Sequence, residues 1–455
     1  MTQTNVQENK MGVVPVPKLL FQMSLPMILS MLVQALYNVV DSIFVAQINE
    51  NALTAVSLVF PVQSLMISIA VGTGVGVNAV LSRSLGERDA KMADESAKNG
   101  IFLAFVSCVV FAVLGVLLAK PFFHMQTADA QIREYGVQYM TIISAFCVAV
   151  YMQVMFERLL QSTGRTFYTM ISQGLGAVIN IIFDPILIFG LFGLPKMGVA
   201  GAAAATVLGQ FCGMFLAMFF NIKFNKDIHI GMRHFRPSGR IIKVIYSVGV
   251  PSIIMQAIGS VMTFGMNKIL IQFTSTATAV FGVYFKLNSF IFMPVFGLNN
   301  GMVPIVAFNY GAGNKKRITQ TIHISIISAV VIMLLGLALF MIFPAQLLGM
   351  FNASKDMLAI GVPALRIICL SFLFAGFCII VGSVFQALGN GVYSLIISAT
   401  RQLLIILPVA VILAKVGGLS AVWWSIPIAE IASVVLSAYF YRKIYREKIA
   451  SLGRK

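Results

Sequence analysis

Charged side chains are scarce in this sequence of 455 residues. Asp, Glu, Lys and Arg together make up 10% of it, whereas 59% of the residues are hydrophobic. Soluble domains carry roughly 25% charged residues, so a soluble protein with this composition would have too little polar surface to cover itself. Acidic residues are the rarest charged class, with 15 against 32 basic ones, which gives a net charge of +17. The composition excludes an ordinary soluble protein.

The residues of several kinds of reactive site are also missing. The five cysteines are an odd number, all lie in apolar segments, and no CxxC pair occurs, so neither a disulfide framework nor a zinc site is indicated. The four histidines are scattered and form no metal set. No GxxxxGK[ST] motif occurs, which argues against an ATPase, and no serine or cysteine nucleophile has a plausible base beside it. We therefore expect neither enzyme activity nor a cofactor.

Long apolar blocks are what the sequence does contain. About 20 apolar residues span the hydrocarbon core of a membrane as a helix, and these blocks are too long for the strands of a membrane barrel. We predict about twelve transmembrane helices, at residues 18–45, 53–81, 97–119, 134–160, 166–190, 198–222, 246–271, 277–306, 319–343, 359–387, 393–414 and 419–440.

The basic residues are distributed unequally between the predicted loops. With both termini placed inside, 23 Lys and Arg fall in inside segments, five in outside loops and four within spans. Cytoplasmic loops of membrane proteins carry such an excess, so we expect a multi-pass protein of the bacterial plasma membrane with both termini in the cytoplasm. The basic patches then contact anionic membrane lipids, and no nucleic acid partner is expected.

The two halves of the chain resemble each other at an offset of about 225 residues. Leu25-Pro26 matches Val250-Pro251, and Gln161-Ser162-Thr163-Gly164 matches Gln386-Ala387-Leu388-Gly389. Because six spans bring the chain back to its starting side, the repeats must be parallel and related by an axis along the membrane normal. The fold class that we predict is an all-α membrane protein with two parallel six-helix lobes and a central cleft between them.

The same pattern predicts the domain boundaries. They are a cytoplasmic tail at 1–17, an N-lobe at 18–222, a basic cytoplasmic linker at 223–245, a C-lobe at 246–440 and a basic cytoplasmic tail at 441–455. We expect a monomer.

Polar residues inside the apolar spans are the candidate functional residues, because ionisable groups in a membrane are costly. Gln34, Asn38 and Asp41 share one face of the first span, and Gln173, Asn180 and Asp184 share one face of the fifth. These two stripes suggest that the helices face each other across a small hydrated pocket, which Thr206 and Gln210 of the sixth span would also line.

A carboxylate in such a pocket has two possible functions. It takes up a proton, because burial disfavours its charged form, or it holds a hard cation such as Na⁺ together with amide and carbonyl oxygens. The alternative is a structural carboxylate paired to a neighbour. Glu157 is a further pocket candidate, although it lies near a cytoplasmic end where Arg158 or Arg165 would pair with it. Glu430 lies deep in the last span and has no polar residue four positions away.

The second lobe has no acids at the positions equivalent to Asp41 and Asp184. Its candidates are polar or basic residues that would serve as ligand contacts, as partners between lobes or as snorkelling cations. They are Asn267, Lys268, Lys286, Asn288 and Arg401.

These residues and the doubled six-span layout resemble the MATE family of multidrug and toxic compound extrusion transporters, on its prokaryotic MepA-like and DinF-like side. The resemblance covers essentially the whole chain. It depends on Pro26 with Gln34 to Asp41, on the Gln161–Gly164 motif, and on Asn180 to Asp184-Pro185.

The resemblance implies secondary active efflux, by which cationic amphipathic drugs and dyes are exchanged for H⁺ or Na⁺. It implies that Asp41, Asn180 and Asp184 are the coupling residues and that Na⁺, if it is the coupling ion, binds there. Such a transporter would work by alternating access and contribute to antibiotic resistance. The alternative is a flippase or exporter of a lipid-linked or other amphiphilic metabolite in the same superfamily. A membrane-embedded enzyme or receptor is a more distant alternative.

Overall fold

A computed structural model describes residues 9–452, which contain helices and no strand. The outermost parts of the predicted tails, residues 1–8 and 453–455, lie outside the described residues. The chain divides into two compact units. Among the described residues, unit 1 comprises Asn9 and Leu29–Gly249, and unit 2 comprises Lys10–Ile28 and residues 250–452.

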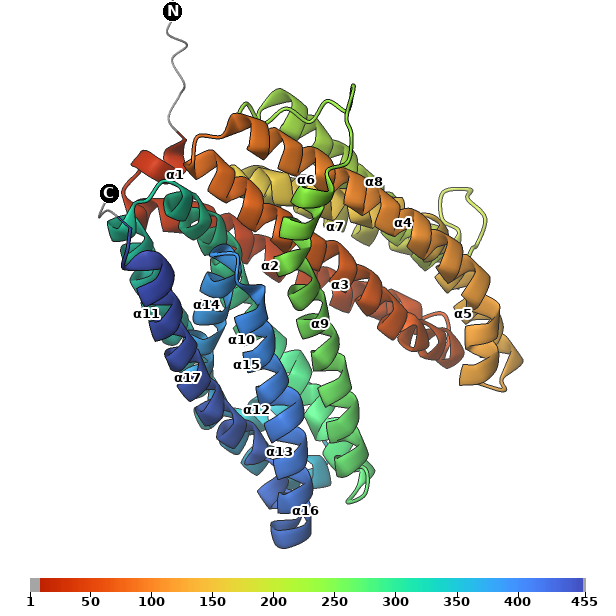
Figure 1. The fold of residues 1–455 in the computed structure, drawn as a ribbon. Coiled ribbons are helices and arrows are strands. Elements are labelled where there is room, and N and C mark those ends of the chain that lie inside the picture. The colour runs from red at the N-terminus through yellow and green to blue at the C-terminus, as the bar shows by residue number, and fades with distance from the viewer. Residues whose placement is uncertain (1–8, 453–455) are drawn as a thin grey trace, which may run out of the picture. The chain divides into compact units, whose positions relative to one another are not determined.

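Unit 1 is a bundle of long helices (Figure 1). It contains α3 (Glu50–Gly86), α4 (Ala90–Gln126), α5 (Ala130–Ala145), α6 (Val148–Ser162), α7 (Thr166–Phe189) and α8 (Val199–Lys223). Its buried apolar residues form one cluster between α3, α4, α6 and α8 and a second cluster between α3, α4, α5 and α8.

Unit 2 repeats this order with more interruptions. It contains the short α1 (Lys10–Val13), α10 (Ser275–Gly311), α11 (Lys315–Ile342), α12 (Pro344–Gly349), α13 (Lys355–Ile368), α14 (Phe372–Ala387), α15 (Gly391–Ala399), α16 (Leu407–Val422) and α17 (Ser425–Ile444), with a 3₁₀ turn η1 (Cys369–Ser371) and π-helical turns η2 (Thr400–Ile406) and η3 (Tyr445–Ile449).

The first long helix of each repeat, α2 (Val16–Ala46) or α9 (Gly239–Leu270), belongs to both units. The opening turns of α2 pack in unit 2, where a Cβ on Gly301 of α10 would lie 2.4 Å from Ser24 Oγ. The opening turns of α9 pack in unit 1, where a Cβ on Gly76 of α3 would lie 2.2 Å from the carbonyl oxygen of Ile245. Glycine permits such close helix packing, so Gly76 and Gly301 have a structural role.

The helix ends repeat at the offset seen in the sequence. Asp89 caps α4 and Asn314 caps α11, and each side chain accepts a hydrogen bond from the backbone amide three residues later. Gly164 and Gly389 both have a left-handed backbone, with φ of 84° and 75°. Each position is followed by its counterpart 225 residues later, so the two repeats share their turn chemistry as well as their helix order.

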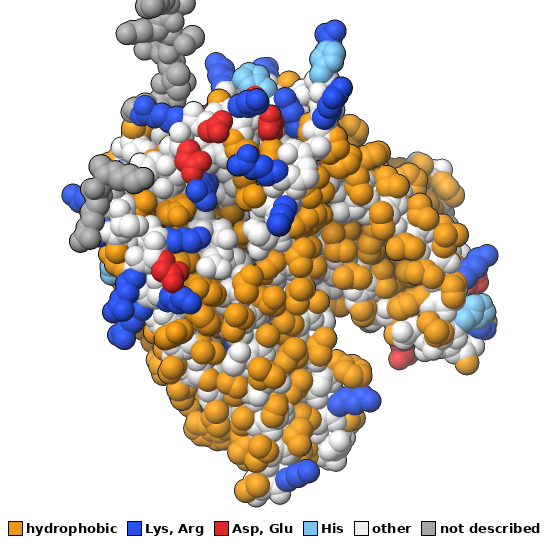
Figure 2. Space-filling view, viewed as in Figure 1, with side chains coloured by type: hydrophobic (Ala, Val, Ile, Leu, Met, Phe, Trp, Pro, Cys, Tyr) orange, Lys and Arg blue, Asp and Glu red, His pale blue; other side chains and the backbone are white. Residues whose placement is uncertain are grey.

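The predicted membrane helices are present, although their count differs slightly. Ten helices of the described chain are long and apolar enough to cross a membrane, or eleven if α5 and α6, which meet at a 46° bend, form one span. The predicted last span corresponds to α17, which is not among the ten or eleven candidate spans. This helix carries Glu430 near its start and two basic residues in its last turn. The exposed large hydrophobic side chains of α4 are mostly Val, Leu and Phe. Figure 2 shows orange hydrophobic surface along the helices of each unit.

Candidate functional site

A close approach of α7 and α8 positions the polar residues of unit 1. A Cβ on Gly209 of α8 would lie 2.5 Å from the carbonyl oxygen of Gly176 on α7. The two backbones therefore touch, and Thr206, one turn from Gly209, is brought against Asn180. Asn180 and Asp184 are four residues apart and share this buried face of α7.

Asn180 connects Asp184 to Thr206. Because an ionised carboxylate only accepts hydrogen bonds, the Asn180 amide nitrogen faces it, and Nδ2 donates to Asp184 Oδ2 over 2.9 Å. The Asn180 side-chain oxygen then accepts from the backbone nitrogen of Thr206 over 3.0 Å. All three side chains are buried, so the amide holds the carboxylate of Asp184 in a fixed place.

Helix α2 brings a second carboxylate to the same place. The carboxyl groups of Asp41 and Asp184 lie close together. Tyr37, one turn before Asp41 on α2, lies near Thr206, and Tyr139 of α5 lies close to both Asp41 and Tyr37. The structure thus joins α2, α7 and α8 through a single polar cluster, which we call the aspartate pair cluster (Tyr37, Asp41, Asn180, Asp184 and Thr206).

Two oxygens of this cluster have no partner among the described residues. They are Asp41 Oδ1 and Asp184 Oδ1, and both are buried. An unsatisfied buried oxygen is costly, and two ionised carboxylates in contact repel each other. A proton shared between them, or a cation bound to both, would satisfy these oxygens and relieve the repulsion.

The other predicted residues of unit 1 are less buried or have other partners. Gln34 and Asn38 share a face of α2 with Asp41, and both are exposed, whereas Asp41 is half-buried. Gln210 lies one turn beyond Thr206 and is half-buried. Gln173 lies near the start of α7, where its amide donates to Glu157. The predicted single polar pocket therefore divides into the aspartate pair cluster and a separate cluster around Glu157.

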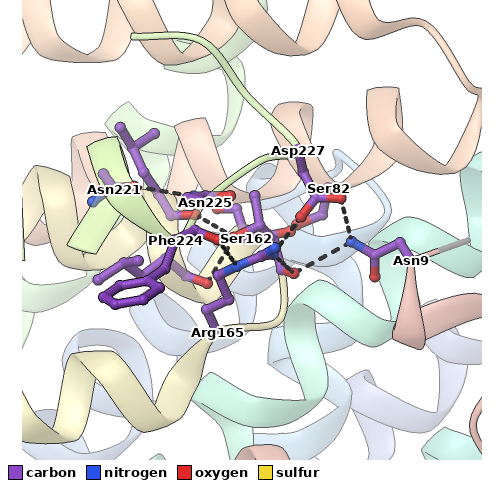
Figure 3. A network of polar contacts seen from close by, with 11 residues as sticks. Asn9, Ser82, Ser162, Arg165, Asn221, Phe224, Asn225 and Asp227 are labelled. Carbon is purple, nitrogen blue, oxygen red and sulfur yellow. Dashed lines mark hydrogen bonds and ion pairs between the residues drawn. The ribbon is translucent and has the colours of Figure 1, made fainter. Parts of the chain in front are cut away.

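Arg165 has its own acidic partner in a network at the end of unit 1 (Figure 3). Its Nη1 pairs with Asp227 Oδ2, and its Nε donates to the carbonyl oxygen of Phe224 over 3.0 Å. Asn9 adds a hydrogen bond of 3.2 Å from Nδ2 to Asp227 Oδ1. Arg165 is therefore engaged away from Glu157, which removes one of the two pairings that the sequence suggested for that acid.

Unit 2 contains a buried ion pair that joins two helices. Arg401 Nη1 lies 3.2 Å from Glu430 Oε2, and the Glu430 side chain is 5% exposed. Arg401 lies in the π-helical turn η2, and Glu430 lies on α17. Such turns are frequent at functional sites. The partner of Glu430 thus comes from another helix.

The remaining candidates of unit 2 do not share one described contact. Lys268 Nζ lies 5.3 Å from the ring centre of Phe264, and Lys286 Nζ lies 5.9 Å from that of Phe351. Both lysines are exposed, as expected of snorkelling cations. Asn267 and Asn288 are half-buried.

A family comparison decides the class of protein. The family model MatE matches residues 26–186 and 251–412, so it matches twice, with the two matches starting 225 residues apart. The chain belongs to the MATE family. It is a multi-pass membrane transporter with the two-lobe fold of that family.

Relatives of this MATE protein cover nearly its whole length. The multidrug export protein MepA of Staphylococcus haemolyticus is 26% identical over 93% of this chain and 92% of its own. The FAD transporter of Shewanella oneidensis is 24% identical over 94% of this chain and 95% of its own. A solved structure described as the outward-facing conformation of a multidrug resistance MATE family transporter is 27% identical, with a TM-score of 0.91 and 99% of both chains covered.

Two residues of this MATE protein's aspartate pair environment escaped the sequence argument. They are Tyr37 and Tyr139. The spacing of Tyr37 and Asp41, four residues apart, was the available signal. No group of three or more His, Cys, Asp or Glu that could hold a metal ion lies within the described residues, so a cation at this site would depend on two carboxylates with amide and hydroxyl oxygens.

Proposed function

We propose that this chain is a secondary multidrug exporter that expels cationic amphipathic compounds in exchange for H⁺ or Na⁺. The observation that carries the proposal is the aspartate pair, whose two buried oxygens lack a partner among the described residues. Ionisable groups within a membrane bundle mark ion pathways in transporters. The MepA relative, named as a multidrug export protein, supports the substrate class.

The coupling residues in this proposal are Asp41, Asn180 and Asp184. Binding of one proton or Na⁺ lowers the negative charge of the pair by one, and its release restores the charge that a cationic substrate favours. Ion and substrate therefore oppose each other's binding, as linkage requires of an exchanger. Alternating access then presents the loaded and unloaded states to opposite sides of the membrane.

We further propose that both termini face the cytoplasm of a bacterial cell. The proposal is supported by the excess of Lys and Arg in the predicted inside segments. In each unit by itself, Figure 2 shows blue side chains gathered towards one end of the helices and few along the orange surface. With this orientation the inward pH and Na⁺ gradients of bacteria drive substrate outward.

The energetics predict that export of a monovalent cation is electrogenic. Moving one charge across about 100 mV yields about 2.3 kcal/mol, whereas a tenfold gradient costs about 1.4 kcal/mol. Exchange of one H⁺ or Na⁺ for one cationic drug moves no net charge and gains nothing from the potential. We therefore expect more than one ion per cycle.

Ethidium efflux from proteoliposomes tests the proposal. We expect efflux under one of two imposed gradients, of pH or of Na⁺, and the effective gradient identifies the coupling ion. We also expect a faster rate when the liposome interior, into which the ion moves, is made negative. Protein-free liposomes are the control. Efflux that is unaffected by both gradients would contradict the proposed coupling, and efflux unaffected by the potential would contradict the stoichiometry.

A second candidate function is export of an anionic amphiphile such as a flavin dinucleotide. It is favoured by the relative named as an FAD transporter and by the two exposed lysines of unit 2, Lys268 and Lys286. The same proteoliposomes loaded with FAD in place of ethidium distinguish the two. FAD efflux without ethidium efflux would favour this candidate over the first.

A further inference from the structure

A basic cavity of about 260 Å³ lies in unit 2, between α11 and the junction of α17 with the π-helical turn η3. Neither the aspartate pair cluster nor the ion pair of Arg401 and Glu430 takes part in it. We call it the α11–η3 cavity. Its lining residues are Thr319, His323, Tyr441, Arg442, Tyr445 and Arg446.

The cations of the α11–η3 cavity are not used by the chain itself. Arg442 and Arg446 are four residues apart, so they lie one turn apart on the same side of the helix. Both are exposed, and in the described part of the chain no ion pair involves either of them. Lys315 adds a third positive charge nearby, with Nζ 5.9 Å from the ring centre of Tyr445.

Acidic side chains that could neutralise these cations are scarce. From residue 250 onward the sequence contains three acids, namely Asp356, Glu430 and Glu447. Glu430 is engaged by Arg401. Glu447 follows Arg446 in the sequence, but it lies close to Lys443 and does not line the cavity. The charge of the α11–η3 cavity therefore fits an anion from outside the chain.

Two tyrosines indicate the level of the cavity in the membrane. Tyr441 and Tyr445 are half-buried, and their ring centres lie 6.1 Å apart. Tyrosine is enriched where a membrane meets water, because its ring is apolar and its hydroxyl is polar. The cavity thus combines cations and phenols in the way expected of a site at the level of lipid headgroups.

Exposed apolar side chains continue from the cavity along both helices. They are Ile327 and Leu334 on α11, and Val435 and Ile431 on α17. Leu334 lies eleven residues from His323, and Ile431 lies eleven residues from Arg442. Eleven residues are about three helical turns, or about 16 Å, so each stripe stays on the face of its cavity residue. This length is close to half of the hydrocarbon core of about 30 Å, which is one leaflet.

The cavity and the two stripes together fit an amphiphile with an anionic head and apolar chains. In unit 2, Figure 2 shows blue side chains near the end of the chain and orange surface further along the helices. A soluble anion would contact the cavity and leave the stripes uncovered. Drug-sized ligands occupy pockets of about 300–1,000 Å³, so the cavity is smaller than a transported drug requires. Basic pockets between membrane helices are known to hold lipid headgroups.

We propose that the α11–η3 cavity binds the phosphate headgroup of an anionic phospholipid, such as phosphatidylglycerol, whose acyl chains lie along the stripes of α11 and α17. Arg442 and Arg446 pair with the phosphate, since a guanidinium can donate two parallel hydrogen bonds to it. A phospholipid with an amine in its headgroup neutralises its own phosphate and is disfavoured. The inference does not depend on the proposed function, because lipid binding is measured without ion or substrate.

Native mass spectrometry of the purified, delipidated full-length protein, titrated with phosphatidylglycerol, tests the proposal. We expect Arg442→Gln combined with Arg446→Gln to bind this lipid about tenfold more weakly than the wild type, because each cation near an anionic headgroup contributes to binding. Phosphatidylethanolamine with the same acyl chains should bind the wild type more weakly than phosphatidylglycerol does. Equal binding of phosphatidylglycerol by the wild type and the double variant would overturn the site.

A second pair of arginines is the matched control. Arg236 and Arg240 are also exposed and four residues apart, and they lie in unit 1. Arg236→Gln combined with Arg240→Gln removes the same charge as the cavity variant. We expect it to bind phosphatidylglycerol as the wild type does. An equal loss in this control would overturn the site, because the effect would then follow from net charge alone.

Two further arms distinguish a lipid from a soluble phosphate. Glycerol 3-phosphate, a headgroup without acyl chains, should not displace phosphatidylglycerol when added at the same concentration. Ile327→Ser combined with Val435→Ser leaves the arginines in place and should weaken lipid binding several-fold, because less apolar surface is covered. Val411→Ser combined with Ile412→Ser, at exposed positions of α16, is the control. Displacement by glycerol 3-phosphate, or unchanged lipid binding in the stripe variant, would overturn the lipid assignment.

Discussion

Asp184→Asn is expected to reduce ion-driven ethidium efflux to the level of protein-free liposomes. The substitution keeps the shape of the side chain but removes its charge and its capacity to release a proton. Asp41 would then face a neutral amide, and the pair could no longer exchange its ions for the cationic substrate. A loss of more than about tenfold in rate corresponds to at least about 1.4 kcal/mol of lost coupling.

The matched control for this prediction is Asp356→Asn. Asp356 is an exposed acid in the first turn of α13. Its substitution removes one negative charge, as Asp184→Asn does, and leaves the aspartate pair intact. We expect it to retain wild-type efflux. Asp184→Asn with undiminished gradient-driven efflux would move the coupling away from the aspartate pair. The structure names Glu157 as the next acid of unit 1 to examine.

The second large effect is expected at the buried ion pair of unit 2. Breaking a fully buried pair by removing one partner costs about 3–5 kcal/mol, and the cost is smaller here because the Arg401 side chain that remains is 28% exposed. We therefore expect Glu430→Gln, which leaves Arg401 unpaired, to lower the thermal unfolding temperature of the purified protein clearly. Replacing both residues by apolar ones of similar volume is often neutral, so Arg401→Met combined with Glu430→Leu should recover most of the loss.

The measurement is thermal unfolding in detergent of the single and double variants. Lys286→Met serves as the control, because Lys286 is exposed and its described contact is the ring of Phe351. A double variant as unstable as Glu430→Gln would contradict this account, because removing the unpaired Arg401 would then recover no stability. The pair would then have no special contribution to the packing of η2 against α17.

Much of the fold was accessible from the sequence because membrane helices and repeats leave strong signals. Apolar blocks of the right length located the spans, and the offset of 225 residues located the second repeat. The caps at Asp89 and Asn314 and the left-handed glycines at Gly164 and Gly389 now give the repeat a physical basis. The last span was harder to judge, since α17 carries Glu430 within its apolar stretch.

The candidate site was only partly accessible. The spacing of Asn180 and Asp184 placed both on one face of α7, and the structure brings Asp41 to them. Helical spacing placed Gln34, Asn38 and Asp41 on one polar face of α2. How deeply each is covered depends on the packing of other helices, which leaves Gln34 and Asn38 exposed and Asp41 half-buried.

Contacts between distant helices lay beyond the reach of sequence spacing. Arg401 and Glu430 are 29 residues apart on different helices, and no periodic pattern relates them. Gln173 looked like part of the stripe of Asn180 and Asp184. Its contacts with Glu157 and Ser30 depend on which helices pack against the start of α7, which a single sequence does not specify.

Ethidium binding to the purified protein at varied pH and Na⁺ concentration tests the central claim most directly. If the aspartate pair binds ion and substrate in opposition, ethidium affinity in the wild type falls as the concentration of the coupling ion rises. Asp184→Asn should bind ethidium with an affinity that no longer depends on that ion. Wild-type ethidium binding that is indifferent to both H⁺ and Na⁺ would contradict coupling at this pair.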